Sequence, residues 1–345
     1  MDDARAQSCA PALATIKDLY EPNVPLYWFD LVGSSVAGWG AVAVLCFARD
    51  LVVAIAAGTA AVTFLYRAYL FNHELSHAAR RIAWFREAWN LLVGFPLLVP
   101  SSLAVGVHAM HHKLHIYGTE EDPEYLPFAR SRFLIVRFIL LTLAFPLLMC
   151  VRFLLLGPGG LLVPRAQRWL VRHATSLALN PHFVRNVGPE EHRIIIREQI
   201  GILLFWSPWL ALLWIGVLPF TVVVSWFVVT TSISLINGVR SLVAHRYRGA
   251  DPNFDRVGQL EDSVNTPDAW WTAVWAPVGH RFHALHHFAP GVPYHNLAIA
   301  YRRVVQAETA LNSSFKVSSS PGLTASLAWL WASAGNPACS GERDV

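Results

Sequence analysis

The sequence predicts an all-α integral membrane protein with two transmembrane helical hairpins and a cytosolic helical cap that carries a histidine-rich site. Of its residues 54% are hydrophobic and only 14% are charged, a composition far from that of a soluble domain. Long apolar runs and three histidine clusters are the other two observations behind this prediction. The four cysteines form no CxxC pair and the basic residues form no lysine-rich block, so neither a thiolate metal site nor nucleic-acid binding is predicted.

The first hairpin follows a polar amino-terminal segment, residues 1–22, which is predicted to stay in the cytosol because no basic region leads into an apolar run. Two apolar runs come next, Tyr27–Ala48 and Leu51–Phe71, separated only by Arg49 and Asp50. Each run has about the 20 residues that are needed to cross a hydrocarbon core of about 30 Å. Together they predict a membrane hairpin that returns the chain to the cytosolic side.

Two further apolar runs are interrupted. Leu91–Val107 is short and contains Pro96 and Pro100, which favours a re-entrant or interfacial segment over a full span. Arg132–Leu156 is long but contains a proline and internal arginines, and we expect it to lie in the interface or to dip and return. In the alternative interpretation it crosses the membrane and one half of the later hairpin does not.

The runs Ile200–Val217 and Thr221–Asn237 predict the second hairpin. Two hairpins also satisfy a parity condition, because the histidine clusters can meet only if an even number of crossings separates them. The membrane domain is therefore predicted to extend over residues 23–305. Residues 306–345, rich in Ser, Ala and Gly, are predicted to form a peripheral tail.

The histidine clusters lie beside the predicted cytosolic membrane face, which Arg80, Arg81 and Arg86 mark by the positive-inside bias. The first cluster, HELSH, also matches the H-E-x-x-H signature of zinc peptidases, so the pentapeptide alone does not decide the chemistry. The candidate metal ligands are His73 and His77 in HELSH, His108, His111 and His112 in HAMHH, His245 in VAHRY, and His283, His286 and His287 in HALHH. Six others are expected to be ordinary surface or core residues: His115, His173, His182, His192, His280 and His295.

The spacing within each cluster places two or three imidazoles on one helical face. Imidazole binds Zn, Cu, Fe and Ni alike, but a catalytic zinc uses three protein ligands, and eight or nine histidines fit two metals better. Among these metals, iron can activate dioxygen against an unactivated C–H bond, which protein side chains cannot do alone. The sequence therefore favours two iron ions over one zinc.

The three histidine clusters HELSH, HAMHH and HALHH, called boxes below, resemble in their order and in their placement after hairpins the integral-membrane fatty acid desaturase and hydroxylase superfamily. The resemblance covers about residues 27–303. The stretches NHELSHAA, HHKLHIYGTEEDP, AHRY and PVGHRFHALHHFAPGVPYHNL are similar to acyl-lipid and sphingolipid-type members. The resemblance implies a di-iron centre held by the eight box histidines, with His245 as the additional ligand. In acyl-CoA members an asparagine one turn before that histidine supports a metal through water; here Ser241 occupies that turn and Asn237 lies two turns back.

Carboxylates near the boxes are candidates for orienting the ligands, since ligating histidines commonly donate their second N–H to a carboxylate. Glu74, Asp122 and Asp262 are the acids chosen for this role, and Asn237 is the remaining supporting candidate. Other acids of GTEEDPEY, Glu124 among them, are further possibilities. The alternative is that these are solvated loop acids.

The predicted function is O2-dependent desaturation of the acyl chain of a membrane lipid, with a methylene held in an apolar tunnel between the helices and water as the second product. Hydroxylation of a fatty acyl, sterol-like or carotenoid lipid is the main alternative. A membrane zinc peptidase and a metal transporter or sensor are the others; an acidic translocation path for the last is not evident in the spans.

Electrons are expected from a separate carrier, a ferredoxin or a small cytochrome, because the chain contains no cysteine cluster for an iron–sulfur centre. Arg246, Arg248 and Arg281 are candidates for attracting an acidic carrier to the cytosolic face. The same arginines also suit lipid headgroups.

Overall fold

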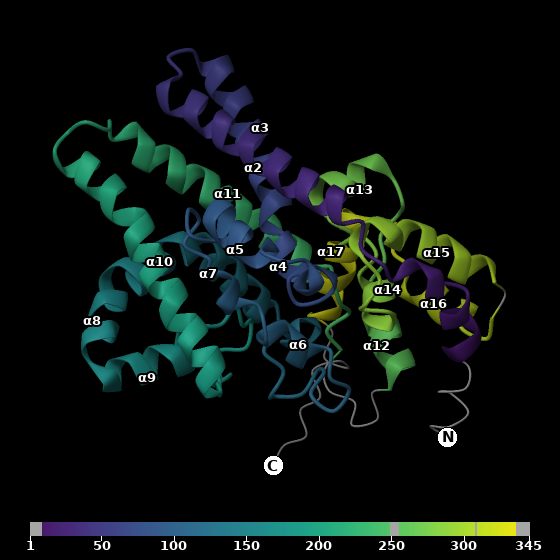
Figure 1. Ribbon diagram of the computed structural model, residues 1–345. Helices are drawn as coiled ribbons and strands as arrows, with labels where there is room; N and C mark the ends of the chain where they lie inside the picture. The colour runs from purple at the N-terminus through teal and green to yellow at the C-terminus, as the bar shows by residue number, and fades with distance from the viewer. Residues whose placement is uncertain (1–8, 249–254, 308, 336–345) are drawn as a thin grey trace.

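The structure, a computed structural model, describes residues 9–248, 255–307 and 309–335, and within them the chain is helical with only isolated β-bridges (Figure 1). The outer ends of the predicted amino-terminal segment and carboxyl-terminal tail, residues 1–8 and 336–345, lie outside the described residues. The helices are α2 (Val24–Phe47), α3 (Leu51–Tyr69), α4 (Phe71–Glu74), α5 (Phe85–Trp89), α6 (Val107–His111), α7 (Arg132–Cys150), α8 (Leu156–Leu162), α9 (Pro164–His173), α10 (Pro189–Trp214), α11 (Thr221–Leu242), α12 (Arg256–Asp262), α13 (Trp270–Trp275), α14 (His283–Phe288), α15 (Leu297–Gln306), α16 (Asn312–Ser318) and α17 (Leu323–Ser333).

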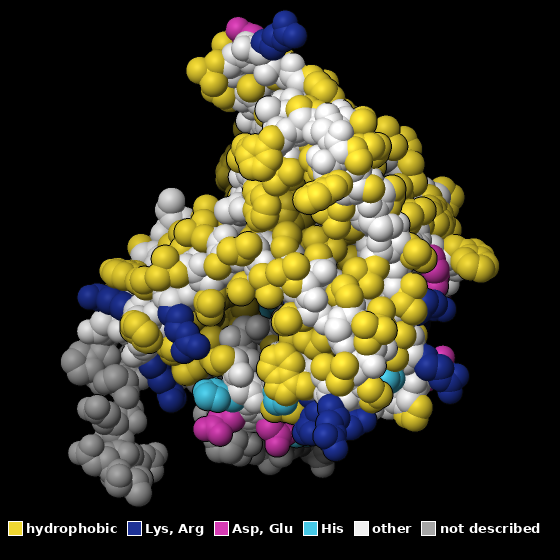
Figure 2. All heavy atoms as spheres, turned by 90° about the vertical axis from the view of Figure 1, so that its left-hand side faces the viewer, with side chains coloured by type: hydrophobic (Ala, Val, Ile, Leu, Met, Phe, Trp, Pro, Cys, Tyr) yellow, Lys and Arg dark blue, Asp and Glu magenta, His cyan; other side chains and the backbone are white. Residues whose placement is uncertain are grey.

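Five helical segments of the described chain are long and apolar enough to cross a membrane. They are Val24–Phe47, Leu51–Glu74, Arg132–Leu162, Pro189–Trp214 and Thr221–Leu242. Figure 1 shows that α2 with α3, and α10 with α11, extend toward the same end of the molecule, away from α6, α12 and α14. Hydrophobic side chains cover that end of the surface in Figure 2, and charged side chains gather at the opposite end and at the very tip. This distribution is typical of a protein embedded in a bilayer.

The proline of the segment from Arg132 does not end the helix, and whether this segment crosses the membrane stays a prediction. α7 continues through Pro146 to Cys150, and a π-helical turn, Val151–Leu155, joins it to α8. The Thr142 carbonyl, which has no N–H partner at Pro146, accepts instead from the Ser234 hydroxyl at 2.8 Å. The arginine of this turn, Arg152, is buried and donates to the Ala174 carbonyl, Gln199 and Thr175. Internal hydrogen bonds therefore accommodate what the sequence presents as interruptions.

The α2–α3 pair is fixed by its caps and by one close approach. The Asn23 side chain accepts from Leu26 N at 3.1 Å and starts α2, and the Asp50 side chain accepts from Val53 N at 3.0 Å and starts α3. Side-chain acceptors of this kind stabilise a helix start by satisfying free N–H groups. Gly38 lets α3 come near, since a Cβ on Gly38 would lie 2.6 Å from Leu65 Cγ.

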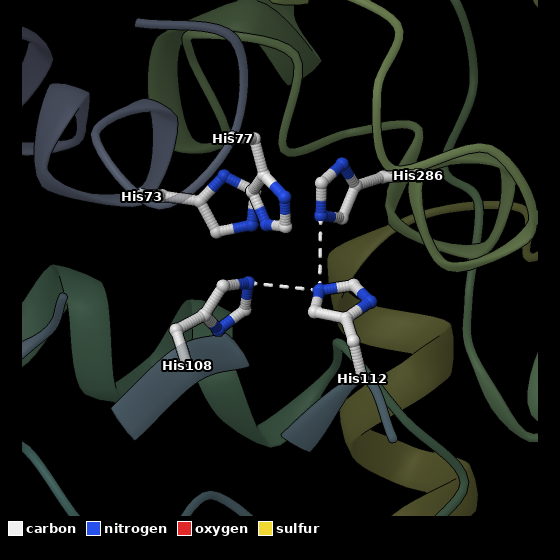
Figure 3. A group of neighbouring side chains, drawn as sticks. All are labelled: His73, His77, His108, His112 and His286. Atoms are coloured by element: carbon white, nitrogen blue, oxygen red, sulfur yellow. Dashed lines mark hydrogen bonds between the residues drawn. The ribbon is translucent and has the colours of Figure 1, made fainter. Parts of the chain in front are cut away.

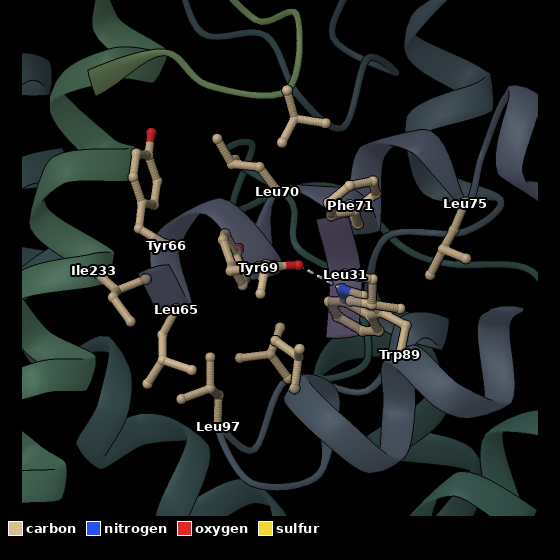
Figure 4. Packing of buried hydrophobic residues seen from close by; sticks show 14 of the residues in the cluster. Leu31, Leu65, Tyr66, Tyr69, Leu70, Phe71, Leu75, Trp89, Leu97 and Ile233 are labelled. Carbon is tan, nitrogen blue, oxygen red and sulfur yellow. Dashed lines mark hydrogen bonds between the residues drawn. The ribbon is translucent and has the colours of Figure 1, made fainter. Parts of the chain in front are cut away.

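The main core lies where the amino-terminal end of α2 and the carboxyl-terminal end of α3 meet the segment after α4. Aromatic residues pack edge to face there, with Tyr27 between Phe71 and Phe85, and Trp89 Nε1 donates to the Ala68 carbonyl at 2.8 Å (Figure 4). Residues 90–103 contain only a π turn and a 3₁₀ turn. The buried Glu198 carboxylate of α10 holds them by accepting from Arg86, Asn90, Ser101 and Ser102.

A second, smaller core supports the carboxyl-terminal part of the chain. Ile16 of the amino-terminal segment, Phe288 of α14 and Phe315 of α16 are buried together in it. Leu330 of α17 is buried in a third cluster with Phe128. The domain limits 1–22, 23–305 and 306–345 stay a prediction, but these contacts attach both terminal segments to the helices around α14.

Candidate metal centre

The histidine boxes come from short helical pieces rather than from one continuous helix. The helical segment of the second span ends within HELSH, because α4 ends at Glu74 and His77 follows it with φ −125° and ψ −112°. The bend still leaves the rings of His73 and His77 near each other, with centroids 5.0 Å apart. The second box lies on α6 and the residue after it, and the third on α14.

Nine histidines converge into two groups in which the possible ligand atoms lie within 4.8 Å of one another. The first group takes residues from all three boxes (Figure 3): His73, His77, His108, His112 and His286. In it His112 Nε2 lies 2.9 Å from His108 Nε2 and 3.2 Å from His286 Nε2. The second and third boxes therefore meet, so α7, α10 and α11, which lie between them in the chain, cannot all be complete membrane crossings.

The second group consists of His111, His245, His283 and His287, all buried. His245 Nε2 lies 3.2 Å from His111 Nε2 and 3.0 Å from His283 Nε2. His287 Nε2 lies 3.2 Å from His283 Nε2. His287 also stacks on His112 of the first group with ring centroids 4.3 Å apart, so the two groups are immediate neighbours.

The approach of the ring nitrogens fits metal coordination better than hydrogen bonding. A neutral Nε2 either donates one proton or accepts with one lone pair, yet His112 Nε2 and His283 Nε2 each face two other Nε2 atoms. Two imidazole ligands about 2.1 Å from one metal and at right angles would lie about 3 Å apart. The observed spacings match that value, so each group fits one metal ion.

Burial keeps most of these imidazoles in the neutral form that binds metal. Burial lowers the pKa of His77, His112 and His287 well below the usual range. Burial likewise lowers the pKa of His283, and the neighbouring His245 and the Arg240 guanidinium lower it further. His111 is the exception, because the Asp122 carboxylate outweighs the effect of burial and raises the His111 pKa.

Two carboxylates of the loop after α6 contact ligand histidines directly. Asp122 has no exposed surface, and its oxygens lie 2.9 and 3.0 Å from His111 Nδ1. Glu124 Oε2 lies 2.8 Å from His108 Nδ1. Asp122 also accepts from Glu124 N at 2.9 Å. Glu124 was one of several possible loop acids in the sequence, and its spacing does not distinguish it, because Glu120 also lies two residues from Asp122.

Asp262 reaches the centre through a tyrosine. Its Oδ2 accepts from Tyr117 OH at 2.8 Å and from Tyr125 OH at 3.0 Å, and lies 3.9 Å from His245 Nδ1. Tyr117 OH in turn lies 2.8 Å from His245 Nδ1 and can accept a hydrogen bond from it. Tyr117 is a functional candidate that the sequence reasoning missed, since nothing in its spacing links it to His245.

The other two supporting candidates lie differently. The Glu74 carboxylate accepts from Tyr27 OH, and its nearest approach to His73 Nδ1 is 3.9 Å, beyond hydrogen-bond distance. Asn237 lies on α11, where its side-chain oxygen accepts from Arg240 at 3.2 Å.

His280 lies closer to the centre than expected. It is buried, its Nδ1 lies 3.0 Å from the Pro277 carbonyl, and its ring centroid lies 4.6 Å from that of His73. It belongs to neither ligand group. Its spacing of three residues from His283 could have indicated this position. His115, by contrast, is exposed as expected.

A cavity of about 550 Å³ lies beside the histidines, between α7 and α11. Its lining includes four of the nine histidines: His73, His108, His245 and His283. Apolar residues of α7 and of the segments around Leu97 and Leu177 line much of the rest, and α11 contributes a row of polar side chains. A cavity therefore lies where the sequence reasoning expected an apolar tunnel, but its wall near α11 is polar.

Comparisons with known proteins agree with this architecture. The model of the family described as fatty acid desaturase matches residues 50–315. The chain is 37% identical over 316 residues to a ceramide hydroxylase of Caulobacter vibrioides, and the match covers 90% of each chain. No solved structure matches the chain.

Proposed function

Because the chain belongs to the fatty acid desaturase family, and so to the oxidoreductases of the desaturase and hydroxylase superfamily, we propose that it hydroxylates a membrane lipid with O2. The proposed substrate class is an N-acylated sphingoid lipid. One observation carries this choice: the relative at 37% identity over nine tenths of both chains is a ceramide hydroxylase. In the net reaction a C–H bond becomes C–OH, and O2, two electrons and two protons also yield one water.

Two iron ions are the proposed cofactor, one held by the group of five histidines and one by the group of four. When bound, they would supply the activation of dioxygen that the side chains cannot provide. Asp122 would accept a hydrogen bond from Nδ1–H of His111, and Glu124 would accept one from Nδ1–H of His108. These hydrogen bonds would fix the tautomer of each imidazole, so that its Nε2 lone pair faces the metal. The cavity would hold the lipid beside these groups and keep bulk water out.

Desaturation of an acyl chain is the second candidate, favoured by the family description. It removes a second hydrogen from the neighbouring carbon, so that O2, two electrons and two protons yield a double bond and two waters. Both reactions need the same histidines and the same electrons. They differ in how the substrate carbon is positioned.

The proposed topology places the histidines on the cytosolic face, with α2–α3 and α10–α11 as the two transmembrane hairpins. α7 would then be the apolar segment that does not fully cross, which satisfies the even number of crossings between the second and third boxes. A ferredoxin or small cytochrome would dock on the cytosolic face. Of the three candidate arginines, Arg281 pairs with Asp268 at 2.9 Å and Arg246 lies over Trp329, whereas Arg248 is exposed.

The test is a mass-spectrometric lipid profile of hosts that make N-acyl sphingoid lipids and express an electron-transfer chain. Wild type is compared with His111→Ala and with His115→Ala, a matched change at an exposed histidine four residues away. We expect wild type and His115→Ala to add one oxygen to the sphingoid lipid, and His111→Ala to add none.

Three results, two from the lipid profile and one from the metal content of the purified protein, would contradict the proposal. A loss of two hydrogens without oxygen gain would replace hydroxylation by desaturation. Purified protein that holds one zinc per chain, and no iron, would refute the two-iron centre and favour a zinc peptidase. Product formation by His111→Ala equal to wild type would show that the second histidine group is not required.

A further inference from the structure

A polar row on α11 faces the cavity. Thr230, Ser234, Asn237, Arg240 and Ser241 all line it. Their spacings of four, three, three and one residues keep them on one face of the helix. α11 is otherwise rich in Val, Ile, Leu and Phe and is long and apolar enough to cross a membrane. Polar and ionisable residues within such a helix are costly, and mark functional sites by default.

The first two hydroxyl groups of this row, those of Thr230 and Ser234, donate hydrogen bonds to carbonyl groups of the protein. The Thr230 hydroxyl donates to the Trp226 carbonyl at 2.7 Å, and the Ser234 hydroxyl donates to the Thr142 carbonyl of α7 at 2.8 Å. These two residues therefore need no ligand. The interest lies in the three residues nearest the histidines: Asn237, Arg240 and Ser241.

The Arg240 guanidinium forms no ion pair within 4 Å among the residues that the structure describes, although its charge helps to lower the pKa of Glu124 in the same cavity wall. Arg240 Nε donates to Asn237 Oδ1 at 3.2 Å, and Arg240 Nη2 donates to Ser241 Oγ at 3.0 Å; the Tyr66 hydroxyl is a third polar neighbour. A guanidinium has five N–H donors, so part of its capacity is left for a ligand. Both neutral partners keep a donor as well, the Asn237 amide and the Ser241 hydroxyl, because each uses its oxygen to accept from Arg240.

We propose that Arg240, Asn237 and Ser241 bind the polar head of the substrate lipid, an uncharged amide with neighbouring hydroxyl groups. This inference rests on the proposed function and deepens it. His245 and His283 line the same cavity, so a head bound here lies beside the metal centre. The oxidised carbon would then be within a few bonds of the head, while the hydrocarbon chain extends along Phe138, Leu141 and Phe145 of α7.

Charge distribution favours an uncharged head over a phosphate. Arg240 lies in the last turn of α11, where the helix dipole presents its negative end and disfavours an anion. The other arginine of the cavity wall, Arg152, is occupied by the Ala174 carbonyl, Thr175 and Gln199. Phosphates are typically met by bidentate arginine pairs or several cations. The single guanidinium of Arg240, together with the Asn237 amide and the Ser241 hydroxyl, is instead suited to donate hydrogen bonds to the amide and alcohol oxygens of an uncharged lipid head.

The experiment measures lipid binding to the purified, metal-free full chain in nanodiscs, so that it does not depend on turnover. Three probes with equal chain lengths are compared: an N-acyl sphingoid lipid, its phosphate ester, and a wax ester without amide or hydroxyl. Arg240→Met is the test variant. Arg137→Met, a change at an exposed arginine of α7, is the matched control, and Arg240→Lys tests partial rescue by charge.

We expect Arg240→Met to weaken binding of the N-acyl sphingoid lipid about 10- to 100-fold, as for loss of a hydrogen bond to a charged group. Binding of the wax ester should stay unchanged, Arg137→Met should match wild type for all probes, and Arg240→Lys should fall between the two. Iron-loaded Arg240→Met should still hold two irons per chain and melt near the wild-type temperature.

Three results would overturn the inference: unchanged sphingoid binding in Arg240→Met, equal losses for the sphingoid lipid and the wax ester, or tighter wild-type binding of the phosphate ester than of the neutral lipid. Failure of the proposed function can be told apart from failure of the proposed head-binding site. Head-dependent binding that Arg240→Met abolishes, together with a wild-type enzyme that forms no hydroxylated lipid, would refute hydroxylation while retaining the head-binding site.

Discussion

Replacement of Asp122 by asparagine tests whether a buried carboxylate tunes the group of four histidines. Asp122 is fully buried and accepts from His111 Nδ1 at 2.9 Å and from Gly118 N at 2.8 Å. Its charge raises the His111 pKa against the opposing effect of burial, which makes this imidazole a stronger ligand. Asparagine keeps the size of the side chain and removes the charge, and it also replaces one of two oxygens that each accept a backbone N–H by a donor, so the change removes the charge together with part of the hydrogen bonding.

The expected magnitude follows from comparable sites. Loss of a residue that orients a metal-bound histidine typically costs 10- to 100-fold in metal affinity, or about 1.4 to 2.7 kcal/mol. The effect should fall on the metal of His111, His245, His283 and His287. The group of five histidines, in which Glu124 contacts His108 Nδ1, should hold its proposed metal as in wild type.

The assay is iron content per chain after equilibration with increasing chelator. Asp122→Asn should pass through a plateau at one iron per chain, at chelator concentrations where wild type still holds two. Glu121→Gln, a change at an exposed acid of the same loop, should follow wild type. The reasoning would be refuted if Asp122→Asn kept both irons as tightly as wild type, or if both left together while the thermal melt was unchanged.

Three further predictions concern packing and topology. Gly38→Val should destabilise the α2–α3 pair by about 1–3 kcal/mol through overpacking, because a Cβ there meets Leu65 Cγ at 2.6 Å; Gly40→Val, where nothing lies within 4 Å, should leave the melting temperature in detergent unchanged. Glu198→Ala should lower the free energy of unfolding by about 3 kcal/mol, because it leaves the buried donors to this carboxylate unpaired. Glu190→Ala, at a side chain that is 77% exposed, should leave the free energy of unfolding unchanged, and equal melting temperatures of the two variants would contradict a stabilising role of the Glu198 hydrogen bonds. A single cysteine within residues 215–220, in a chain without native cysteines, should react with an impermeant maleimide outside intact cells; protection there would contradict the proposed topology.

Local sequence already determined the membrane character and the histidine inventory of this protein. Composition and run length depend on residues next to each other in the chain, and the long apolar runs recur as helices long enough to span a bilayer. The spacing of the boxes likewise constrains which imidazoles share a face. The eight histidines selected on this basis, and His245, which the family resemblance added, all lie in the two groups.

Only the tertiary structure decided how these parts combine. The division of the histidines into five and four depends on segments that lie far apart in sequence, such as those of His111 and His245, which are separated by 134 positions. The link from Asp262 to His245 through Tyr117 and the position of Arg240 beside the cavity depend on packing in the same way. Helical periodicity sets neighbours only within a few turns, whereas contacts between distant segments follow from the packing of the whole chain.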